Sequence, residues 1–200
     1  MKLYMVRHGQ SEENLRKAYS GQMDSRLTAQ GEKDALGARK VLQGISFDKV
    51  YSSDLSRAVR TQEIALPGII SEKLPLVREI SVGNLEGKKF EDLGESFVLS
   101  RSTYNFVPYG GENYEMLQKR AKKFLEMMVK EDCDTIAVFS HGGFINTVLG
   151  VILGCRVTNV NALSDNCGVS VFEYNGGNWA LRKWNMTADD KLTEYDGRGV

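Results

Sequence analysis

One pattern constrains this chain more than any other: a short apolar run that ends in a histidine and a glycine, and that occurs twice. Residues 3–6 (Leu-Tyr-Met-Val) lead into Arg7-His8-Gly9, and residues 135–139 (Thr-Ile-Ala-Val-Phe) lead into Ser140-His141-Gly142. Such runs predict buried strands, and the glycines predict a tight turn after each of them. The chain has only two histidines, and each of them follows one of these predicted strands.

Helical and strand patterns alternate along most of the chain. Four segments have apolar residues at helical spacing: residues 28–42, 55–64, 113–130 and 144–153. A continuous apolar run such as residues 135–139 is typical of a parallel strand covered on both faces. Residues 169–184, with Asn175-Gly-Gly-Asn178 in the middle, predict one antiparallel hairpin near the C-terminus. The predicted fold class is therefore three-layer α/β/α with a central, mostly parallel sheet.

Length and composition indicate one domain, residues 1–200, with a polar tail expected over residues 187–200. The 26 basic residues balance the 26 acidic ones, so no overall field favours nucleic acid or an anionic membrane. The three cysteines are scattered and form no C-x-x-C pair, which argues against a disulfide framework or a zinc site. No signal-peptide pattern precedes the first strand. We expect a cytoplasmic protein without membrane or nucleic-acid partners, and a homodimer stays open.

A cation lies near the start of the second predicted helix. We expect Ser53 or Asp54 to cap this helix, which places Arg57 in its first turn. A cation there opposes the helix dipole, at a cost of a few tenths of a kcal/mol to about 1 kcal/mol. Arg57 is better explained if its guanidinium and the free helix amides face a common anion. The plainer alternative is an ion pair with Asp54 or Glu63 on the same helix.

The two strand-end motifs suit phosphoryl chemistry. Ligands of open α/β sheets bind beyond the carboxyl ends of the strands, where both histidines are predicted to lie. A neutral imidazole is a nucleophile, and nearby arginines disfavour its protonated form. Phosphoryl oxygens match the arginine fork, so attack of His8 on phosphorus would give a phosphohistidine. Arg57 would clamp the phosphate, and His141 would stabilise charge in the transition state. Each histidine taken alone could equally be a strand-end residue bonded to a backbone carbonyl.

A carboxyl group is needed to complete this chemistry. The leaving oxygen needs a proton and the attacking water later needs a base, and one carboxyl can serve both steps in turn. Glu79 is the candidate, because it follows a short apolar segment and precedes a glycine loop, with Glu86 or Glu12 as alternatives. Residues 88–112 show no clear pattern, and we expect them to form a lid or wall over the site.

Five blocks of the chain resemble, in the same order, the signature segments of the histidine phosphatase superfamily, in the branch that includes cofactor-dependent phosphoglycerate mutase. The blocks are Arg7-His8-Gly9 with Asn14, Asp24–Gly31, Ser52–Thr61, Arg78–Gly87, and Gly110-Gly111-Glu112 completed by Ser140–Gly143. The resemblance spans about residues 1–175. Arg-His-Gly by itself would be a weak signal, but the ordered set is specific.

The resemblance implies an α/β phosphatase fold and a reaction that needs neither a metal nor a cofactor. It implies that His8 is the nucleophile and Glu79 the general acid, with Arg7, Arg57 and His141 holding the phosphoryl group. Further phosphate or substrate contacts are expected from Ser11, Asn14, Gly21, Gln22 and Gly142. Asn14 also has a plainer interpretation, as a cap or turn residue.

Departures from the family pattern bear on the reaction and the substrate. Mutases are generally longer, and their acid segment carries an extra basic pair, whereas residues 78–83 here contain no histidine and no second arginine. Leu85 stands where small phosphatases usually show tryptophan, and Asn113 where serine is common. We therefore predict a hydrolase of a small phosphomonoester metabolite, with phosphoglycerate mutase as the alternative.

Two interpretations from other classes are weaker. A non-catalytic module that binds phosphorylated ligands would require the loss of a catalytic residue. None of the five candidates is missing: Arg7, His8, Arg57, Glu79 and His141. A nucleotide-binding α/β domain would carry G-x-G-x-x-G or the Walker lysine after its first strand, and residues 7–11 carry neither.

Overall fold

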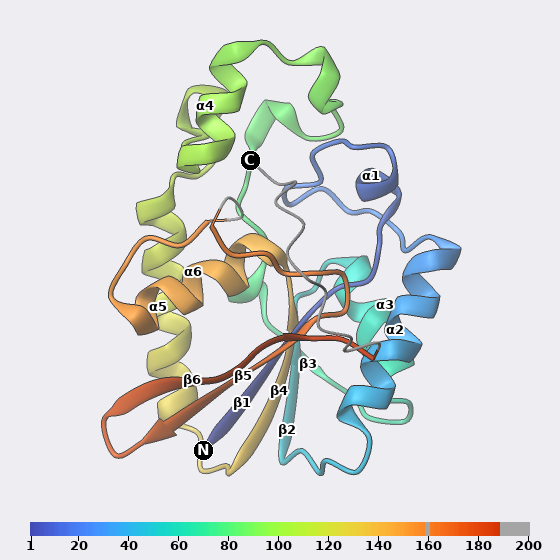
Figure 1. Ribbon diagram of the computed structural model, residues 1–200, viewed down its shortest axis with the longest axis vertical. Helices are drawn as coiled ribbons and strands as arrows, with labels where there is room; N and C mark the ends of the chain where they lie inside the picture. Colours follow the sequence, from blue (N-terminus) through green and yellow to red (C-terminus); the bar gives the residue numbers. More distant parts are fainter. Residues whose placement is uncertain (159–160, 189–200) are drawn as a thin grey trace.

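The computed structural model of the chain describes residues 1–158 and 161–188. Within them, six strands form one sheet in the order β3-β2-β4-β1-β5-β6 (Figure 1). The first four strands in this order are parallel, and β5 runs antiparallel to both β1 and β6. The strands are β1 Lys2–Arg7, β2 Lys49–Ser52, β3 Glu72–Lys73, β4 Thr135–Ser140, β5 Val169–Asn175 and β6 Asn178–Met186. The mostly parallel sheet with one hairpin is confirmed; residues 189–200 of the expected polar tail lie outside the described residues.

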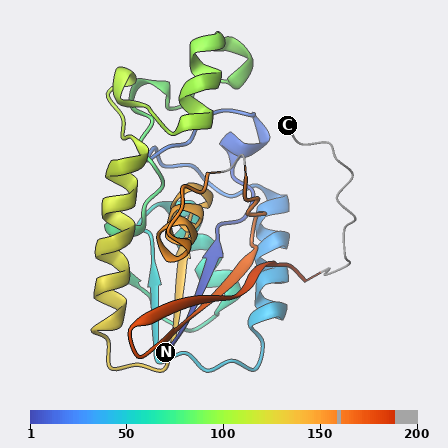
Figure 2. The same cartoon turned by 60° about the vertical axis from the view of Figure 1, so that its left-hand side comes forward.

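Helices cover both faces of the sheet (Figure 2). Helices α2 and α3 pack together on one face, and α5 and α6 pack together on the other. The α-helices are α1 Glu12–Leu15, α2 Ala29–Leu42, α3 Ser56–Ala65, α4 Glu95–Thr103, α5 Tyr114–Val129 and α6 Gly142–Leu153. The 3-10 helices are η1 Pro75–Val77, η2 Gly83–Leu85, η3 Phe90–Asp92 and η4 Val107–Tyr109. The predicted three-layer α/β/α arrangement is confirmed.

The apolar run of β1 follows from its place in the middle of the sheet. Leu3 and Met5 are fully buried in the core cluster that contains Phe144 of α6, whereas Val6 is buried in the cluster that contains Ala35 of α2. Successive side chains of a strand point to opposite faces, so a strand covered by helices on both faces needs apolar residues at almost every position.

The pairing of β1 with β4 brings the two histidines together. The strands are parallel neighbours with Arg7 opposite Ser140, and the backbone N–H of His8 donates to the Ser140 carbonyl at 3.0 Å. His8 follows Arg7 and His141 follows Ser140, so both histidines lie side by side at the carboxyl edge of the sheet. The ring centroids of His8 and His141 lie 5.1 Å apart.

Two glycines allow the turn after β1 to lie directly on α2. A Cβ at Gly9 would lie 2.3 Å from the Gly31 carbonyl oxygen, and a Cβ at Gly31 would lie 2.1 Å from the Gln10 carbonyl oxygen. The Thr28 hydroxyl caps α2 by accepting the Gly31 N–H at 3.0 Å. The close approach fixes the backbone that carries His8 against the start of a helix.

The start of α3 differs from the prediction. The helix begins at Ser56, whose backbone N–H donates to the Asp24 carboxylate at 2.7 Å. Asp54 pairs instead with Arg78, and the hydroxyl of Ser53 contacts His141. The predicted local cap is wrong because the loop after α1 lies against the helix start and supplies a carboxylate from a distant segment.

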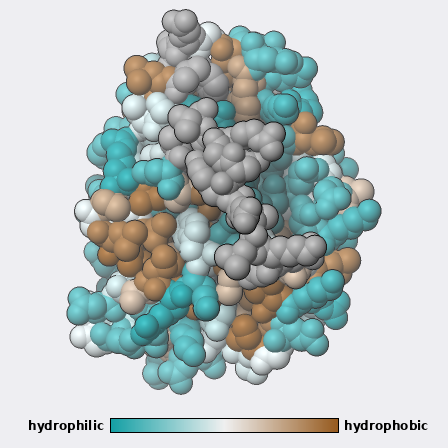
Figure 3. Space-filling view, viewed as in Figure 1, coloured by the Kyte–Doolittle hydropathy of each residue, from teal (hydrophilic) through white to brown (hydrophobic). Residues whose placement is uncertain are grey.

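Residues 88–112 lie beyond the carboxyl ends of the strands, together with α1 (Figure 1). They contain η3, α4 and η4, and four of their side chains form part of the wall expected there: Phe90, Arg101, Tyr104 and Phe106. None of the helices within residues 1–158 and 161–188 is long and apolar enough to cross a membrane. On the face seen in Figure 3, hydrophobic side chains gather in separate patches among hydrophilic ones. Exposed large apolar residues occur on several elements and include Leu15, Ile70, Leu99, Leu153 and Leu163.

Candidate active site

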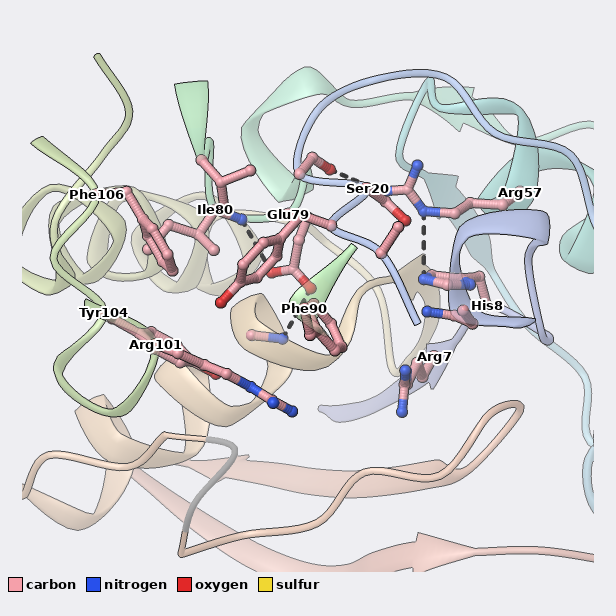
Figure 4. Close-up of a pocket in the computed structure, with 16 residues that line it drawn as sticks. Arg7, His8, Ser20, Arg57, Glu79, Ile80, Phe90, Arg101, Tyr104 and Phe106 are labelled. Atoms are coloured by element: carbon pink, nitrogen blue, oxygen red, sulfur yellow. Dashed lines mark hydrogen bonds between the residues drawn. The ribbon is translucent and has the colours of Figure 1, made fainter. Parts of the chain in front are cut away.

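A cavity of about 210 Å³ opens at the carboxyl edge of the sheet (Figure 4). The site motifs contribute Arg7, His8, Asn14, Gly21, Arg57, Glu79 and Gly143 to its lining. The remaining lining residues are Ala18, Tyr19, Ser20, Ile80, Val82, Phe90, Arg101, Tyr104 and Phe106. One end of the cavity is therefore cationic, and the rest of its wall is mainly aromatic and aliphatic.

His8 is held with one ring nitrogen bonded and the other facing Arg57. Its Nδ1 lies 2.7 Å from the Gly9 carbonyl oxygen, so Nδ1 carries the proton and donates it. Nε2 is then a lone pair, and it accepts a hydrogen bond from Arg57 Nε at 3.3 Å. Burial lowers the pKa of His8 well below its usual 6.5, and the charges of Arg57 and Arg7 lower it further. His8 is therefore a neutral imidazole that carries its lone pair on Nε2.

Arg57 is fully buried, and backbone carbonyls orient its guanidinium. Nη1 donates to the Met23 carbonyl at 2.9 Å and Nη2 donates to the Gly21 carbonyl at 2.8 Å. Burial lowers its pKa to about 10, so the side chain remains a cation at neutral pH. The two carboxylates considered as its partners on the helix bond to other arginines. The interpretation of Arg57 as part of an anion site is therefore preferred to that of a surface ion pair.

Arg7 supplies a second cation, which is partly buried. One of its Nη atoms donates to the Ser164 carbonyl, and within the described part of the chain its buried Nε has no hydrogen-bond partner. Burial lowers the pKa of Arg7 from its usual value. Gly142 lies beside it, and a Cβ there would be 3.4 Å from Arg7 Nε.

His141 is fully buried and precedes α6. Its Nε2 lies 2.9 Å from the Ser53 hydroxyl oxygen, and its Nδ1 has no hydrogen-bond partner among the described residues. Burial lowers the pKa of His141 well below 6.5, with the charges of Arg57 and Arg7 acting in the same direction. This imidazole is therefore neutral too.

Glu79 places its carboxylate at the amino end of α6. Oε1 accepts the N–H of Ile80 at 2.9 Å, and Oε2 accepts the N–H of Gly143 at 3.0 Å. Among the described residues that line the cavity, Glu79 carries the only carboxyl group. Glu86 is not in the lining, and its Oε1 accepts the N–H of Gln22 at 2.8 Å.

The predicted substrate-binding residues fall into two groups. Asn14 and Gly21 line the cavity, whereas Ser11, Gln22 and Gly142 do not. Ser11 and Asn14 form a reciprocal cap of α1, which agrees with the plainer interpretation of Asn14. The Gln22 side chain donates to the Glu79 carbonyl at 3.1 Å, so it contacts the backbone of the candidate acid.

Some residues hold the backbone of the site in place, and this role was not predicted for them from the sequence. Asn166 donates to the His8 carbonyl at 3.0 Å, and the Thr61 hydroxyl accepts the Gly9 N–H at 3.0 Å. Thr61 lies inside a motif block and could have been found there. Asn166 lies in an irregular segment with no periodic signal, and Ser53 was given only the role of a cap.

The model of the histidine phosphatase superfamily (branch 1) matches residues 3–187. The chain belongs to this superfamily. Its adenosylcobalamin/alpha-ribazole phosphatase relative from Salmonella typhimurium is 29% identical over 161 residues, which covers 76% of this chain and 80% of that one. A probable phosphoglycerate mutase from Escherichia fergusonii is 26% identical over 205 residues, with 98% of this chain and 95% of that one covered.

Solved structures agree with the fold. The crystal structure of a putative alpha-ribazole-5'-P phosphatase from Escherichia coli matches this chain with a TM-score of 0.83 and 26% sequence identity. The match covers 93% of this chain and 96% of that chain. The chain is an enzyme of the histidine phosphatase family.

Proposed function

We propose that this enzyme hydrolyses small phosphomonoesters through a phosphohistidine at His8. The observation that supports this most directly is the state of the His8 ring. Its proton is bonded to the Gly9 carbonyl, so the lone pair on Nε2 lies beside the buried guanidinium of Arg57. A nucleophile next to a cation suits an anionic electrophile, and a phosphoryl group is one.

The first half of the reaction transfers the phosphoryl group to the enzyme. His8 Nε2 forms a bond to phosphorus while the bond from phosphorus to the leaving oxygen breaks, and the electron pair goes to that oxygen. Glu79, in its protonated form, donates the proton that makes the leaving group an alcohol. Arg7, Arg57 and His141 interact with the other phosphoryl oxygens and stabilise their charge.

The second half returns the enzyme to its starting state. The Glu79 carboxylate accepts a proton from a water molecule as that water attacks phosphorus. The nitrogen–phosphorus bond breaks, phosphate leaves, and His8 Nε2 regains its lone pair. Side-chain cations meet the phosphoryl charge throughout, so the proposed reaction is metal-independent, and a chelator should leave the rate unchanged.

The cavity favours a small substrate. Its volume of about 210 Å³ is below the roughly 300–1,000 Å³ of sites that hold drug-sized ligands. The wall opposite His8 is built from the 88–112 segment, and Figure 4 shows Phe90, Arg101, Tyr104 and Phe106 around the cavity. The leaving group is therefore expected to be compact and to contact both apolar surface and one further cation.

Rapid-quench labelling with a ³²P-labelled phosphomonoester tests the proposal. We expect an acid-labile, alkali-stable phosphoenzyme that forms and decays at the rate of turnover. His8→Ala should retain the fold by circular dichroism and form no labelled species. Turnover without labelling in the wild type, or unchanged labelling in His8→Ala, would contradict the mechanism.

A phosphoglycerate mutase remains the second candidate, because one relative of the chain carries that name. A mutase returns the phosphoryl group to a glycerate rather than to water. Isomerisation of 3-phosphoglycerate should be measured with and without 2,3-bisphosphoglycerate, beside phosphate release. We expect hydrolysis to dominate in both, and strong isomerisation that depends on the bisphosphate would overturn our choice.

A further inference from the structure

The two histidines of the site have neighbours of opposite kind. A carbonyl oxygen, which can only accept, lies next to Nδ1 of His8. A hydroxyl, which can donate, lies next to Nε2 of His141. Because a neutral imidazole has one N–H and one lone pair, the neighbour decides which nitrogen carries the proton.

The Ser53 hydroxyl has one direction left in which to donate. Ser53 is fully buried, and its oxygen accepts the backbone N–H of Leu55 at 3.4 Å. Buried hydroxyl groups rarely leave their proton without an acceptor. Among the described residues, His141 Nε2 at 2.9 Å is the acceptor within reach of that proton.

We infer that Ser53 is a positioning residue that holds neutral His141 in the tautomer with its proton on Nδ1. The Ser53 O–H donates to Nε2, so the ring proton is placed on Nδ1. That nitrogen is buried and has no hydrogen-bond partner among the described residues. It is therefore available to donate to a phosphoryl oxygen, in the site that the proposed function assigns to phosphate.

The other tautomer would oppose binding of an anion. With the proton on Nε2, the ring would donate to Ser53 and present the lone pair of Nδ1 instead. A buried lone pair next to phosphoryl oxygens repels them, and both groups are left without a donor. The low pKa of His141, caused first by burial, keeps a second proton from removing this distinction. Ser53 thus supplies a donor to the site, because its contact with Nε2 places the ring proton on the other nitrogen, Nδ1.

The tautomer of His141 in the wild-type protein is the first test of the inference. The chain contains only two histidines, so an imidazole ¹⁵N–¹H correlation spectrum contains two ring systems, which His8→Ala assigns. We expect both rings to carry their proton on Nδ1, and we expect inorganic phosphate to shift the Nδ1–H signal of His141. A proton on Nε2 of His141 in the wild type would overturn the inference.

Substitution at position 53 provides the second measurement. Ser53→Ala should populate the Nε2–H tautomer of His141 and raise the Kd of inorganic phosphate about tenfold, which is about 1.4 kcal/mol. Ser53→Thr keeps the hydroxyl and should restore both the tautomer and the affinity. Ser52→Ala is the matched control, because Ser52 is equally buried but donates to the Ser53 carbonyl at 2.8 Å.

The outcomes separate this inference from the proposed function. Equal phosphate affinity in Ser53→Ala and Ser52→Ala, with the same tautomer in both, would contradict it. Neither the spectrum nor phosphate binding requires turnover. The role of Ser53 is therefore not contradicted if labelling of His8 fails. A spectrum with the proton on Nε2 of His141 contradicts it even if labelling succeeds.

Discussion

Glu79 and Gly143 fit together so closely that a side chain at position 143 would displace the Glu79 carboxylate. The Gly143 N–H donates to Glu79 Oε2 at 3.0 Å, and a Cβ at position 143 would lie 2.4 Å from Oε1. The carboxylate of the candidate acid is thus bound to the first turn of α6, at the second residue after His141. Its position depends on the glycine as much as on the carboxylate.

Gly143→Ala should therefore displace the Glu79 carboxylate. We expect kcat for an alkyl phosphate to fall about 10- to 100-fold, within the range that general acid catalysis contributes. 4-Nitrophenyl phosphate should lose much less, since its leaving group needs no proton. Steady-state kinetics with both substrates measure the difference, and Glu79→Gln gives the reference for loss of the acid. Gly37→Ala in α2 is the control, and equal losses for both leaving groups would disprove the role of Glu79.

Arg57→Lys should inactivate the enzyme although it keeps the charge. A lysine has a single ammonium, whereas Arg57 donates at once to His8, Met23 and Gly21. We expect kcat/KM to fall about 10³-fold, because misplacing the cation removes transition-state stabilisation and leaves buried carbonyls without donors. Arg60→Lys, an exposed arginine on the same helix, should stay within twofold. A small effect at Arg57 would show that charge alone suffices.

Stability should fall on mild acidification because the two histidines are buried as neutral groups. The pKa of each is well below 6.5 in the folded chain, so between that value and 6.5 only the unfolded chain takes up the protons. The free energy of unfolding is then unaffected by these groups above about pH 7.5 and falls as the pH drops through 6.5. The loss approaches about 1.4 kcal/mol per pH unit for each histidine.

Urea unfolding at pH 7.5, 6.5 and 5.5 measures this dependence. His8→Gln and His141→Gln should each remove one histidine's share of the slope, and the double variant should remove both. Because these are the only histidines in the chain, no other imidazole contributes. An unchanged slope in the double variant would mean that other groups cause the acid sensitivity.

Arg101→Gln should change the choice of substrate rather than the chemistry. Its guanidinium stacks on Phe90 at 4.6 Å from the ring centroid, and both residues line the cavity. We expect the ratio of kcat/KM for 3-phosphoglycerate to that for glycerol 3-phosphate to fall about tenfold, since the two differ by one carboxylate. Turnover of 4-nitrophenyl phosphate should change little. Arg39→Gln, exposed on α2, is the control, and an unchanged ratio in Arg101→Gln would exclude Arg101 from selection.

The pair His8 and His141 could be predicted because each follows a continuous apolar strand. Parallel neighbours end at the same edge of a sheet, so two such histidines meet if their strands pair, as β1 and β4 do. Position along the chain offered Glu79 with Glu86 and Glu12 as alternatives, and the family resemblance assigned it the role of acid, because residues 75–80 form a 3-10 helix and a loop without a strand. Its seat on α6 depends on a contact between distant segments.

Other parts of the site leave no periodic signal in the sequence. Arg57 is oriented by backbone carbonyls at Gly21 and Met23, and a carbonyl is present at every position of a chain. Asn166 supports His8 from an irregular segment, where no pattern distinguishes it from any other loop asparagine. Much of the aromatic wall comes from η3 and from the residues between α4 and η4, and these pieces are too short to show a periodic pattern.

The contact of Gly9 with Gly31 limits which sequences can carry this site at all. Each obstacle to a side chain there is a carbonyl oxygen of the main chain, at 2.3 Å from Gly9 and at 2.1 Å from Gly31. A change of side chain elsewhere cannot remove a carbonyl, so substitutions at these two positions have no second-site compensation. In a library selected for activity both should remain glycine, while Gly37, on the same helix as Gly31, is free to vary.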